Sequence, residues 1–163
     1  YKGKEYLNQV RLKNIITISL QEINFTDFLR ERVKFFEVIA QANDKTIDTH
    51  IAQNIWITMN DTELERLIDN NLSNAIKHSY DKSNIEVILE KGHSETILKF
   101  ISKGENISDV SMIFDKGYTE THSAKRSLGL GLNMVKNIII TQDYLEYRII
   151  WFLLLKKWLP ITI

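Results

Sequence analysis

The chain has 163 residues, enough for one domain with a buried core, and its 21 basic residues balance its 21 acidic residues. This balance excludes an overall field that would select nucleic acid, and the absence of cysteine excludes disulfides and thiolate–zinc sites. The polar N-terminus is unlike a signal peptide, and the apolar run over 149–155 is far shorter than the roughly 20 residues that span a bilayer.

Helix-like and strand-like segments alternate along the chain without an internal repeat. Apolar residues three or four apart predict helices, and alternating apolar residues predict strands. The expected elements are a short helix over 5–16, a strand over 21–25, a helix over 26–43 capped by Thr26, strands over 46–51 and 54–59, a helix over 61–79, a hairpin of strands over 84–90 and 95–102, a helix over 130–140 and a strand-like tail from Tyr144. This order predicts a two-layer α/β (α+β) sandwich, a mixed, mostly antiparallel sheet with helices packed on one face.

Two of the helices show a clear apolar face. The helix over 26–43 is expected to bury Phe28, Leu29, Val33, Phe36, Val38 and Ile39. The helix over 61–79 is expected to turn Leu64, Leu67, Ile68, Leu72, Ala75 and Ile76 toward the sheet.

The helix over 61–79 also contains asparagines, which are poor helix formers because their amides compete for backbone hydrogen bonds. Asn70, Asn74, Lys77 and His78 follow an i, i+4, i+7, i+8 spacing and so form a second stripe beside the apolar one. Taken alone, such a stripe is typical of a solvated helix flank. Two downstream segments favour a binding site instead.

Both downstream segments contain glycine next to a regular element. "SKGENI" (102–107) follows a strand, and "SLGLGL" (127–132) runs directly into a helix. A glycine loop at a helix N-terminus presents free N–H groups and the positive end of the helix dipole to a phosphate. Neither segment is a Walker loop or a dinucleotide fingerprint, because the lysine and the glycine spacing of those motifs are missing.

Taken in order, these segments resemble the ATP-binding domain of sensor histidine kinases, in the gyrase, chaperone, histidine kinase and mismatch-repair ATPase superfamily. "DNNLSNAIKHS" (69–79) resembles the N box, "SKGENI" the first glycine box, "IFDKGYTE" (113–120) the F box and the start of the ATP lid, and "SLGLGL" the second glycine box. The resemblance covers roughly residues 21–140. It implies the Bergerat ATP-binding fold with ATP and Mg²⁺ as cofactors.

The resemblance assigns catalytic roles to Asn70, Asn74 and Lys77. Asn74 offers its side-chain oxygen to Mg²⁺, a cation that prefers oxygen ligands. Asn70 occupies the position where hydrolysing relatives place a glutamate, and its amide cannot take a proton from water. Lys77 neutralises phosphate charge, and His78 packs on the ribose or phosphate side. Asn71 is expected to face away from the nucleotide.

The glycine boxes depart from the family pattern in three places. Ser102 stands where the family has the aspartate that binds the adenine amino group, so adenine recognition is expected to be weaker than usual. Asn106 and Ser127 replace glycines. The full set of implied nucleotide-binding residues adds, to the four on the helix, Ser102, Gly104, Asn106, Ile107, Lys116, Gly117, Tyr118, Thr119, Arg126, Ser127, Leu128, Gly129, Leu130, Gly131 and Leu132. Phe114 is expected to serve as a hinge for a lid over 115–127.

The resemblance also implies how the chain is organised. Residues 1–20 are expected to be the end of an upstream dimerisation helix and linker, and residues 21–163 the ATP-binding domain. The implied partners are the chain's own upstream dimerisation and phosphoacceptor domain and the receiver domain of a response regulator, with no nucleic acid. The intact protein is expected to be a homodimer anchored in the cell membrane, with this domain in the cytoplasm.

Two alternatives remain open from the sequence. One is an interaction module or pseudokinase with impaired nucleotide binding, which the changes at Ser102 and Ser127 allow. The other is a serine kinase of the anti-sigma type from the same superfamily. The helix over 5–16 argues against the second, because it resembles the exit of a dimerisation helix.

Overall fold

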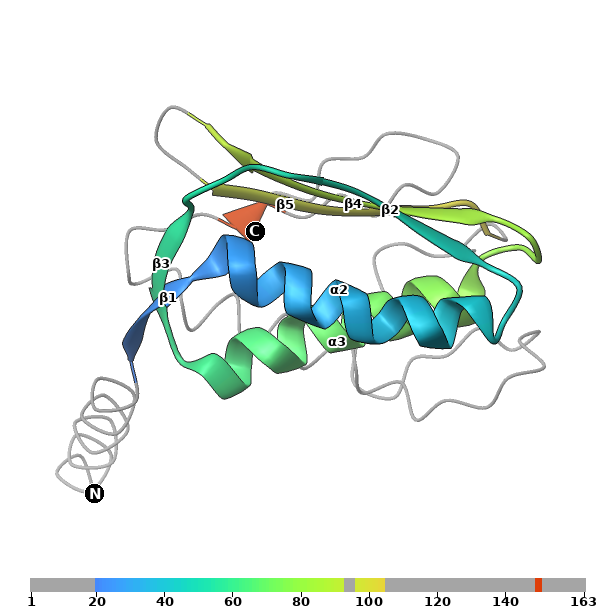
Figure 1. Ribbon diagram of the computed structural model, residues 1–163, viewed down its shortest axis with the longest axis horizontal. Coiled ribbons are helices and arrows are strands. Elements are labelled where there is room, and N and C mark those ends of the chain that lie inside the picture. The colour runs from blue at the N-terminus through green and yellow to red at the C-terminus, as the bar shows by residue number, and fades with distance from the viewer. Residues whose placement is uncertain (1–19, 93–95, 105–148, 151–163) are drawn as a thin grey trace, which may run out of the picture.

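The computed structural model describes residues 20–92, 96–104 and 149–150. Its elements are β1 (Gln21–Asn24), α2 (Phe25–Gln41), β2 (Thr46–Ile51), β3 (Trp56–Met59), α3 (Asp61–His78), β4 (Asn84–Lys91), β5 (Thr96–Ser102) and β6 (Ile149–Ile150) (Figure 1). The expected helices over 5–16 and 130–140 and most of the apolar tail lie outside the described residues.

The described elements form two layers. One layer is a sheet in the order β2–β4–β5–β6, in which β4 and β5 are antiparallel and the pairs β2–β4 and β5–β6 are parallel. The helices α2 and α3 lie side by side against one face of this sheet, and β1 and β3 pair as an antiparallel ribbon at one end (Figure 1). The predicted α/β sandwich with a mixed sheet is therefore confirmed, as is the hairpin of β4 and β5.

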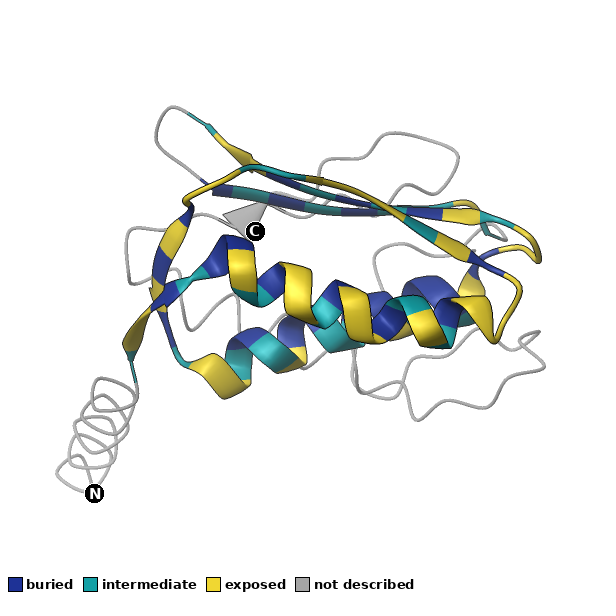
Figure 2. Cartoon of the chain, in the orientation of Figure 1, coloured by how far each residue is buried: buried dark blue, intermediate teal, exposed yellow. Residues whose placement is uncertain are grey.

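The core lies between the sheet and the two helices. Alternate residues of β4 and β5 point inward, so that Ile85, Val87 and Leu98 are fully buried against the helical layer. In Figure 2 the buried positions gather on the sides of the strands and helices that face each other. On α3 the whole expected apolar stripe is buried.

For one residue of α2, the prediction of a place in the core is wrong. Leu29, Val33 and Phe36 are buried as predicted, but Val38 is 69% exposed. Two residues turn an α-helix by about 200°, so Val38 points away from the face that contains Phe36. Its apolar character therefore says nothing about burial.

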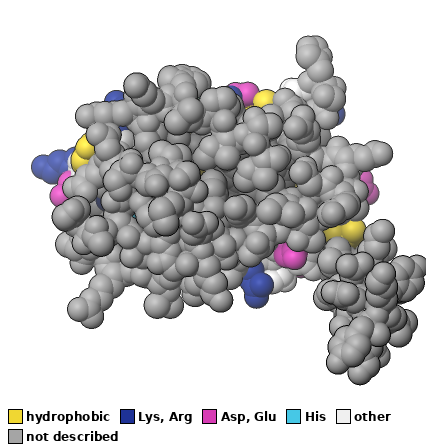
Figure 3. All heavy atoms as spheres, turned by 180° about the vertical axis from the view of Figure 1, so that it is seen from behind, with side chains coloured by type: hydrophobic (Ala, Val, Ile, Leu, Met, Phe, Trp, Pro, Cys, Tyr) yellow, Lys and Arg dark blue, Asp and Glu magenta, His cyan; other side chains and the backbone are white. Residues whose placement is uncertain are grey.

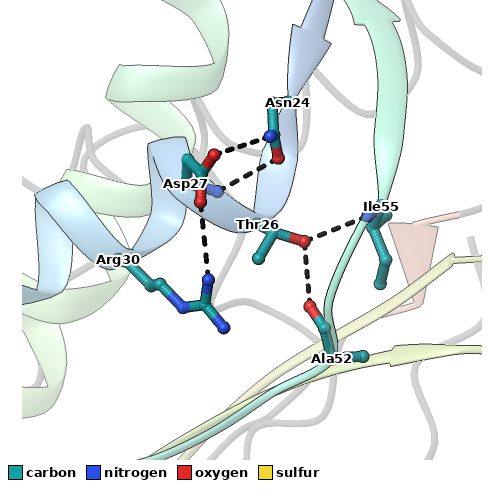
Figure 4. A network of polar contacts seen from close by, with 6 residues as sticks. All are labelled: Asn24, Thr26, Asp27, Arg30, Ala52 and Ile55. Carbon is teal, nitrogen blue, oxygen red and sulfur yellow. Dashed lines mark hydrogen bonds and ion pairs between the residues drawn. The ribbon is translucent and has the colours of Figure 1, made fainter.

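The start of α2 also differs from the prediction. The helix begins at Phe25, and Asn24 is its N-cap, because the Asn24 Oδ1 accepts a hydrogen bond from the Asp27 backbone N–H at 3.2 Å. Thr26 lies inside the first turn and is buried. Its hydroxyl donates to the Ala52 carbonyl at 2.8 Å and accepts from the Ile55 N–H at 3.0 Å (Figure 4). Thr26 thus ties α2 to the segment between β2 and β3.

The same segment explains why β3 is shorter than expected. The sequence predicts a strand from residue 54, whereas β3 begins at Trp56. Asn54 has a φ of 57°, in the left-handed region that asparagine tolerates better than most residues. This conformation turns the chain just before the strand and places the Ile55 N–H on the Thr26 hydroxyl.

Replacing Thr26 with valine is expected to lower the free energy of unfolding by about 2 kcal/mol, because the Ile55 N–H loses its acceptor inside the protein. Urea denaturation followed by circular dichroism measures this loss. Thr58→Val is the matched control, since Thr58 is exposed on β3 and the same change there is expected to stay within about 0.5 kcal/mol. Equal effects of the two substitutions would contradict the role assigned to the Thr26 hydroxyl.

Candidate functional site

The helix α3 has well-defined ends. Asn60 is its N-cap, with its Oδ1 accepting from the Glu63 backbone N–H at 3.0 Å, and Ser79 is its C-cap. Acidic residues lie in the first turn, and Lys77 and His78 lie in the last turn. This charge arrangement complements the helix dipole at both ends.

The predicted second stripe of α3 lies at the border between core and surface. Asn70, Asn74 and Lys77 are half-buried and His78 is exposed, whereas the residues of the apolar stripe are buried. The four side chains therefore share one flank of the helix, as the spacing predicts.

The two amides on this flank differ in their contacts. The Asn70 Nδ2 donates to the Arg66 carbonyl at 2.8 Å. This bond uses the amide nitrogen, whereas a cation binds the amide oxygen. Within the described ranges the Asn74 amide makes no hydrogen bond to the protein. A half-buried amide of this kind suits Mg²⁺, which takes few protein oxygens together with phosphate oxygens and water. No three His, Cys, Asp or Glu side chains of the described residues come together as metal ligands.

The first glycine box packs directly on the end of α3. Ser79 and Gly104 form an isolated antiparallel bridge, and the Tyr80 N–H donates to the Lys103 carbonyl at 2.8 Å. A Cβ atom added to Gly104 would lie 2.3 Å from the His78 carbonyl oxygen. Gly104 and the end of the N box are thus in backbone contact, although 26 positions separate Gly104 from His78. Ser102 lies two residues earlier, at the end of β5.

The other implied binding residues lie outside the described residues, as do the expected hinge Phe114 and the lid over 115–127. These binding residues are Asn106, Ile107, Lys116, Gly117, Tyr118, Thr119, Arg126, Ser127, Leu128, Gly129, Leu130, Gly131 and Leu132. Their roles stay predictions.

An ion-pair cluster that the sequence analysis missed supports α3 from α2. The Arg32 guanidinium donates from Nε and Nη2 to the two carboxylate oxygens of Asp69 at 2.9 and 2.5 Å, and its Nη1 lies 3.1 Å from Glu65. Paired bonds of this kind fix orientation as well as distance. Because Asp69 directly precedes Asn70, the cluster holds the start of the N box. Nothing in the local sequence pairs residues 37 positions apart.

Asn71 is a buried asparagine of α3, and the N-box motif does not indicate its burial. Its side chain is buried under α3, where Nδ2 donates to the Leu67 carbonyl at 2.6 Å. Its buried Oδ1 has no hydrogen-bond partner among the described residues. The sequence did contain a signal for this burial, since Asn71 falls on the apolar stripe four residues after Leu67 and four before Ala75.

Replacing Asn71 with leucine is expected to raise the free energy of unfolding by about 1–3 kcal/mol, because it removes a buried carbonyl oxygen that has no hydrogen-bond partner in the described part of the chain. Thermal and urea unfolding of the variant measure the gain. Ser73→Leu is the control for helix propensity, because Ser73 is exposed on the same helix and a leucine there buries nothing. A loss of stability in Asn71→Leu would show that the amide is needed where it lies.

Charged side chains of both signs are visible among the described residues (Figure 3). Figure 3 shows basic and acidic side chains of the described residues around the rim of the rear face, in line with the balanced composition. Among the described helices, none is long and apolar enough to cross a membrane.

Comparison with known proteins defines the family. The sequence profile of the family "Histidine kinase-, DNA gyrase B-, and HSP90-like ATPase" matches residues 59–148. The sensor protein DltS of Streptococcus agalactiae serotype III (strain NEM316) is 25% identical over 126 residues, which cover 75% of this chain and 32% of DltS. The chain spans about a third or less of the length of the curated relatives it matches.

Solved structures define the fold. The mycobacterial sensor histidine kinase MprB matches with a TM-score of 0.65 at 17% identity, covering 76% of this chain and 80% of that one. The catalytic domain of histidine kinase ThkA matches with a TM-score of 0.64 at 20% identity over the same shares. The described part of the chain has the Bergerat fold of these ATPase domains.

The chain therefore belongs to the family of histidine kinase-, DNA gyrase B- and HSP90-like ATPases. Among its sequence relatives are proteins named as sensor kinases, such as the sensor histidine kinase WalK of Bacillus subtilis (strain 168), which is 24% identical over 149 residues that cover 80% of this chain and 24% of WalK.

Proposed function

We propose that this chain binds Mg²⁺–ATP along the Asn70–Asn74–Lys77 flank of α3 and donates the γ-phosphate to a histidine on an upstream dimerisation domain. The observation that supports this proposal most directly is the contact of Gly104 with the His78 carbonyl. It brings the first glycine box against the last turn of the N box, so that residues far apart in sequence line one site.

Each residue of the flank has a separate task in this proposal. The Asn74 amide oxygen holds Mg²⁺, and the Lys77 ammonium neutralises phosphate charge. Bound Mg²⁺ supplies the charge that balances the phosphate oxygens during transfer. Asn70 keeps a polar contact in the site, but it cannot act as a base toward water, so ATP is reserved for the acceptor histidine.

The transfer itself breaks the bond between the γ-phosphorus and the bridging oxygen and forms a phosphorus–nitrogen bond on the acceptor imidazole. Such a reaction depends on holding the acceptor in line with the leaving group. Neither histidine of the described residues has the setting of the family's acceptor, a helical histidine followed by an acidic residue. His50 lies exposed on the strand β2, 3.5 Å from Glu86, and His78 lies in the last turn of α3 but is followed by Ser79.

The acceptor is therefore placed upstream of the ATP-binding domain, which we assign to residues 21–163. Residues 1–20 are then the end of a dimerisation helix and linker, and the whole protein is a homodimer that passes its phosphate to a receiver domain. The curated relatives, which are about three times as long as the matched region or more, leave room for these parts.

Incubation with γ-labelled ATP tests this assignment. The 163-residue chain is expected to stay unlabelled and to hydrolyse ATP only slowly, while a longer chain with the upstream helices acquires an acid-labile, base-stable phosphate. Stoichiometric self-labelling of the short chain on one of its own histidines would overturn the proposal. A fluorescent ATP analogue that fails to bind with or without Mg²⁺ would favour an interaction module instead.

A further inference from the structure

Lys45 is a buried lysine at the end of the site where Asn74 and Lys77 lie. It follows α2 directly, after a turn in which Asp44 has a φ of 55°, and it is only 2% exposed. Its backbone N–H donates to the Ala40 carbonyl at 2.9 Å, so its main chain is fixed to the end of α2. Its ammonium donates from Nζ to the Ile76 carbonyl of α3 at 2.6 Å.

A buried ammonium is expensive unless its hydrogen bonds compensate for the lost water. The Ile76 carbonyl is a suitable partner, because the last carbonyls of a helix have no partner within it and lie at the negative end of the dipole. The C-terminal ends of α2 and α3 lie at the same end of the helical layer, which allows the contact (Figure 1).

The last turn of α3 is therefore held from three directions. The Ser79 N–H donates to the Ala75 carbonyl at 3.1 Å, Lys45 holds the Ile76 carbonyl, and Gly104 packs on the His78 carbonyl. The first contact belongs to the helix itself, the second comes from the α2–β2 turn, and the third comes from the first glycine box. Of these, only Lys45 brings a charge.

The same turn carries the side chains that the proposed function uses. The Ile76 carbonyl belongs to the peptide that leads into Lys77, and Asn74 lies two residues before it. We propose that Lys45 is a positioning residue for the nucleotide site: its ammonium fixes the last turn of α3 so that Asn74 and Lys77 meet Mg²⁺–ATP. This inference rests on the proposed function, and Lys45 acts through α3 without touching the nucleotide.

Lys45→Met tests the proposal, because methionine keeps an unbranched stem and removes the ammonium. The affinity for a fluorescent ATP analogue with Mg²⁺, measured well below the unfolding temperature, is expected to fall about tenfold, the scale found for residues that orient metal ligands. Amide hydrogen exchange at Ser79 is expected to become faster, since its bond to Ala75 lies in the turn that Lys45 holds.

Thr26→Val is the matched control for a general loss of stability. Thr26 loses buried hydrogen bonds at the opposite end of α2, and this variant is expected to keep the parental affinity. Lys45→Arg, which retains a cation, is expected to restore the affinity to within about threefold of the parent. If Lys45→Met does not fold, Lys45→Gln replaces it, with a neutral donor on a stem one atom shorter and an expected loss of about threefold.

A double-mutant cycle with Asn74→Ala separates positioning from simple destabilisation. If Lys45 acts by placing Asn74, the loss caused by Asn74→Ala is smaller in the Lys45→Met background than in the parent. Additive losses, or parental affinity in the Lys45 variants, overturn this inference alone. A parent that binds no nucleotide overturns the proposed function, and this inference with it.

Discussion

A single methyl group added at Gly104 is expected to disrupt both the fold and the site. In Gly104→Ala the new Cβ would lie 2.3 Å from the His78 carbonyl oxygen and 3.2 Å from its carbon. Both atoms belong to the backbone, so no side chain can move aside. The end of β5 must then separate from the end of α3, and the expected loss in free energy of unfolding is about 3 kcal/mol, at the upper end for overpacking.

The same separation is expected to weaken nucleotide binding beyond what the lost stability explains. Gly104 and the last turn of α3 would no longer be in contact, so Asn74 and Lys77 would lie displaced from the first glycine box. Urea denaturation and titration with a fluorescent ATP analogue measure the two effects on one protein. Lys103→Ala is the control, because Lys103 is exposed on the same segment and uses its backbone carbonyl for the bond to Tyr80. A Gly104→Ala variant with parental stability and affinity would show that the backbone yields at little cost.

The fold was predictable where its cause is local. The apolar stripe of α3 follows from the helical period, and the inward residues of β4 and β5 follow from alternation, so both agree with the structure. The predicted start of α2 was wrong because asparagine and threonine are both good N-cap residues, and Asn24 and Thr26 lie only two positions apart. Only the contacts of Thr26 with Ala52 and Ile55, set by tertiary packing, decide between the two.

The candidate site also has a local part and a long-range part. Spacing and motif predicted that Asn70, Asn74 and Lys77 share one flank of a helix, and the structure has them there, while their roles stay predictions. The contacts that hold this helix join distant segments: Arg32 to Asp69, Lys45 to the Ile76 carbonyl, and Gly104 to the His78 carbonyl. In the sequence Lys45 is one lysine among many, and its burial depends on where the end of α2 packs.

Loss of the Asn74 amide is expected to remove the Mg²⁺-dependent part of nucleotide binding. In Asn74→Ala the affinity for an ATP analogue with Mg²⁺ should fall by about 10- to 100-fold. The affinity for the same analogue after a chelator has removed Mg²⁺ should change little. Titration of both proteins with and without Mg²⁺ makes this comparison. Ser73→Ala is the control, since Ser73 is exposed one residue earlier on α3.

Stability separates this effect from damage to the helix. Within the described ranges the Asn74 amide makes no hydrogen bond to the protein, and alanine is the better helix former, so Asn74→Ala should gain about 0.5 kcal/mol in free energy of unfolding. A variant that is more stable than the parent and yet binds Mg²⁺–ATP poorly would have lost a metal ligand and nothing else. Parental affinity for Mg²⁺–ATP in Asn74→Ala would show instead that the metal is held by other residues, and the role assigned to Asn74 would be wrong. The two measurements separate the explanations because asparagine has a low helix propensity, so its removal from α3 lowers nucleotide affinity only if its amide oxygen binds the metal.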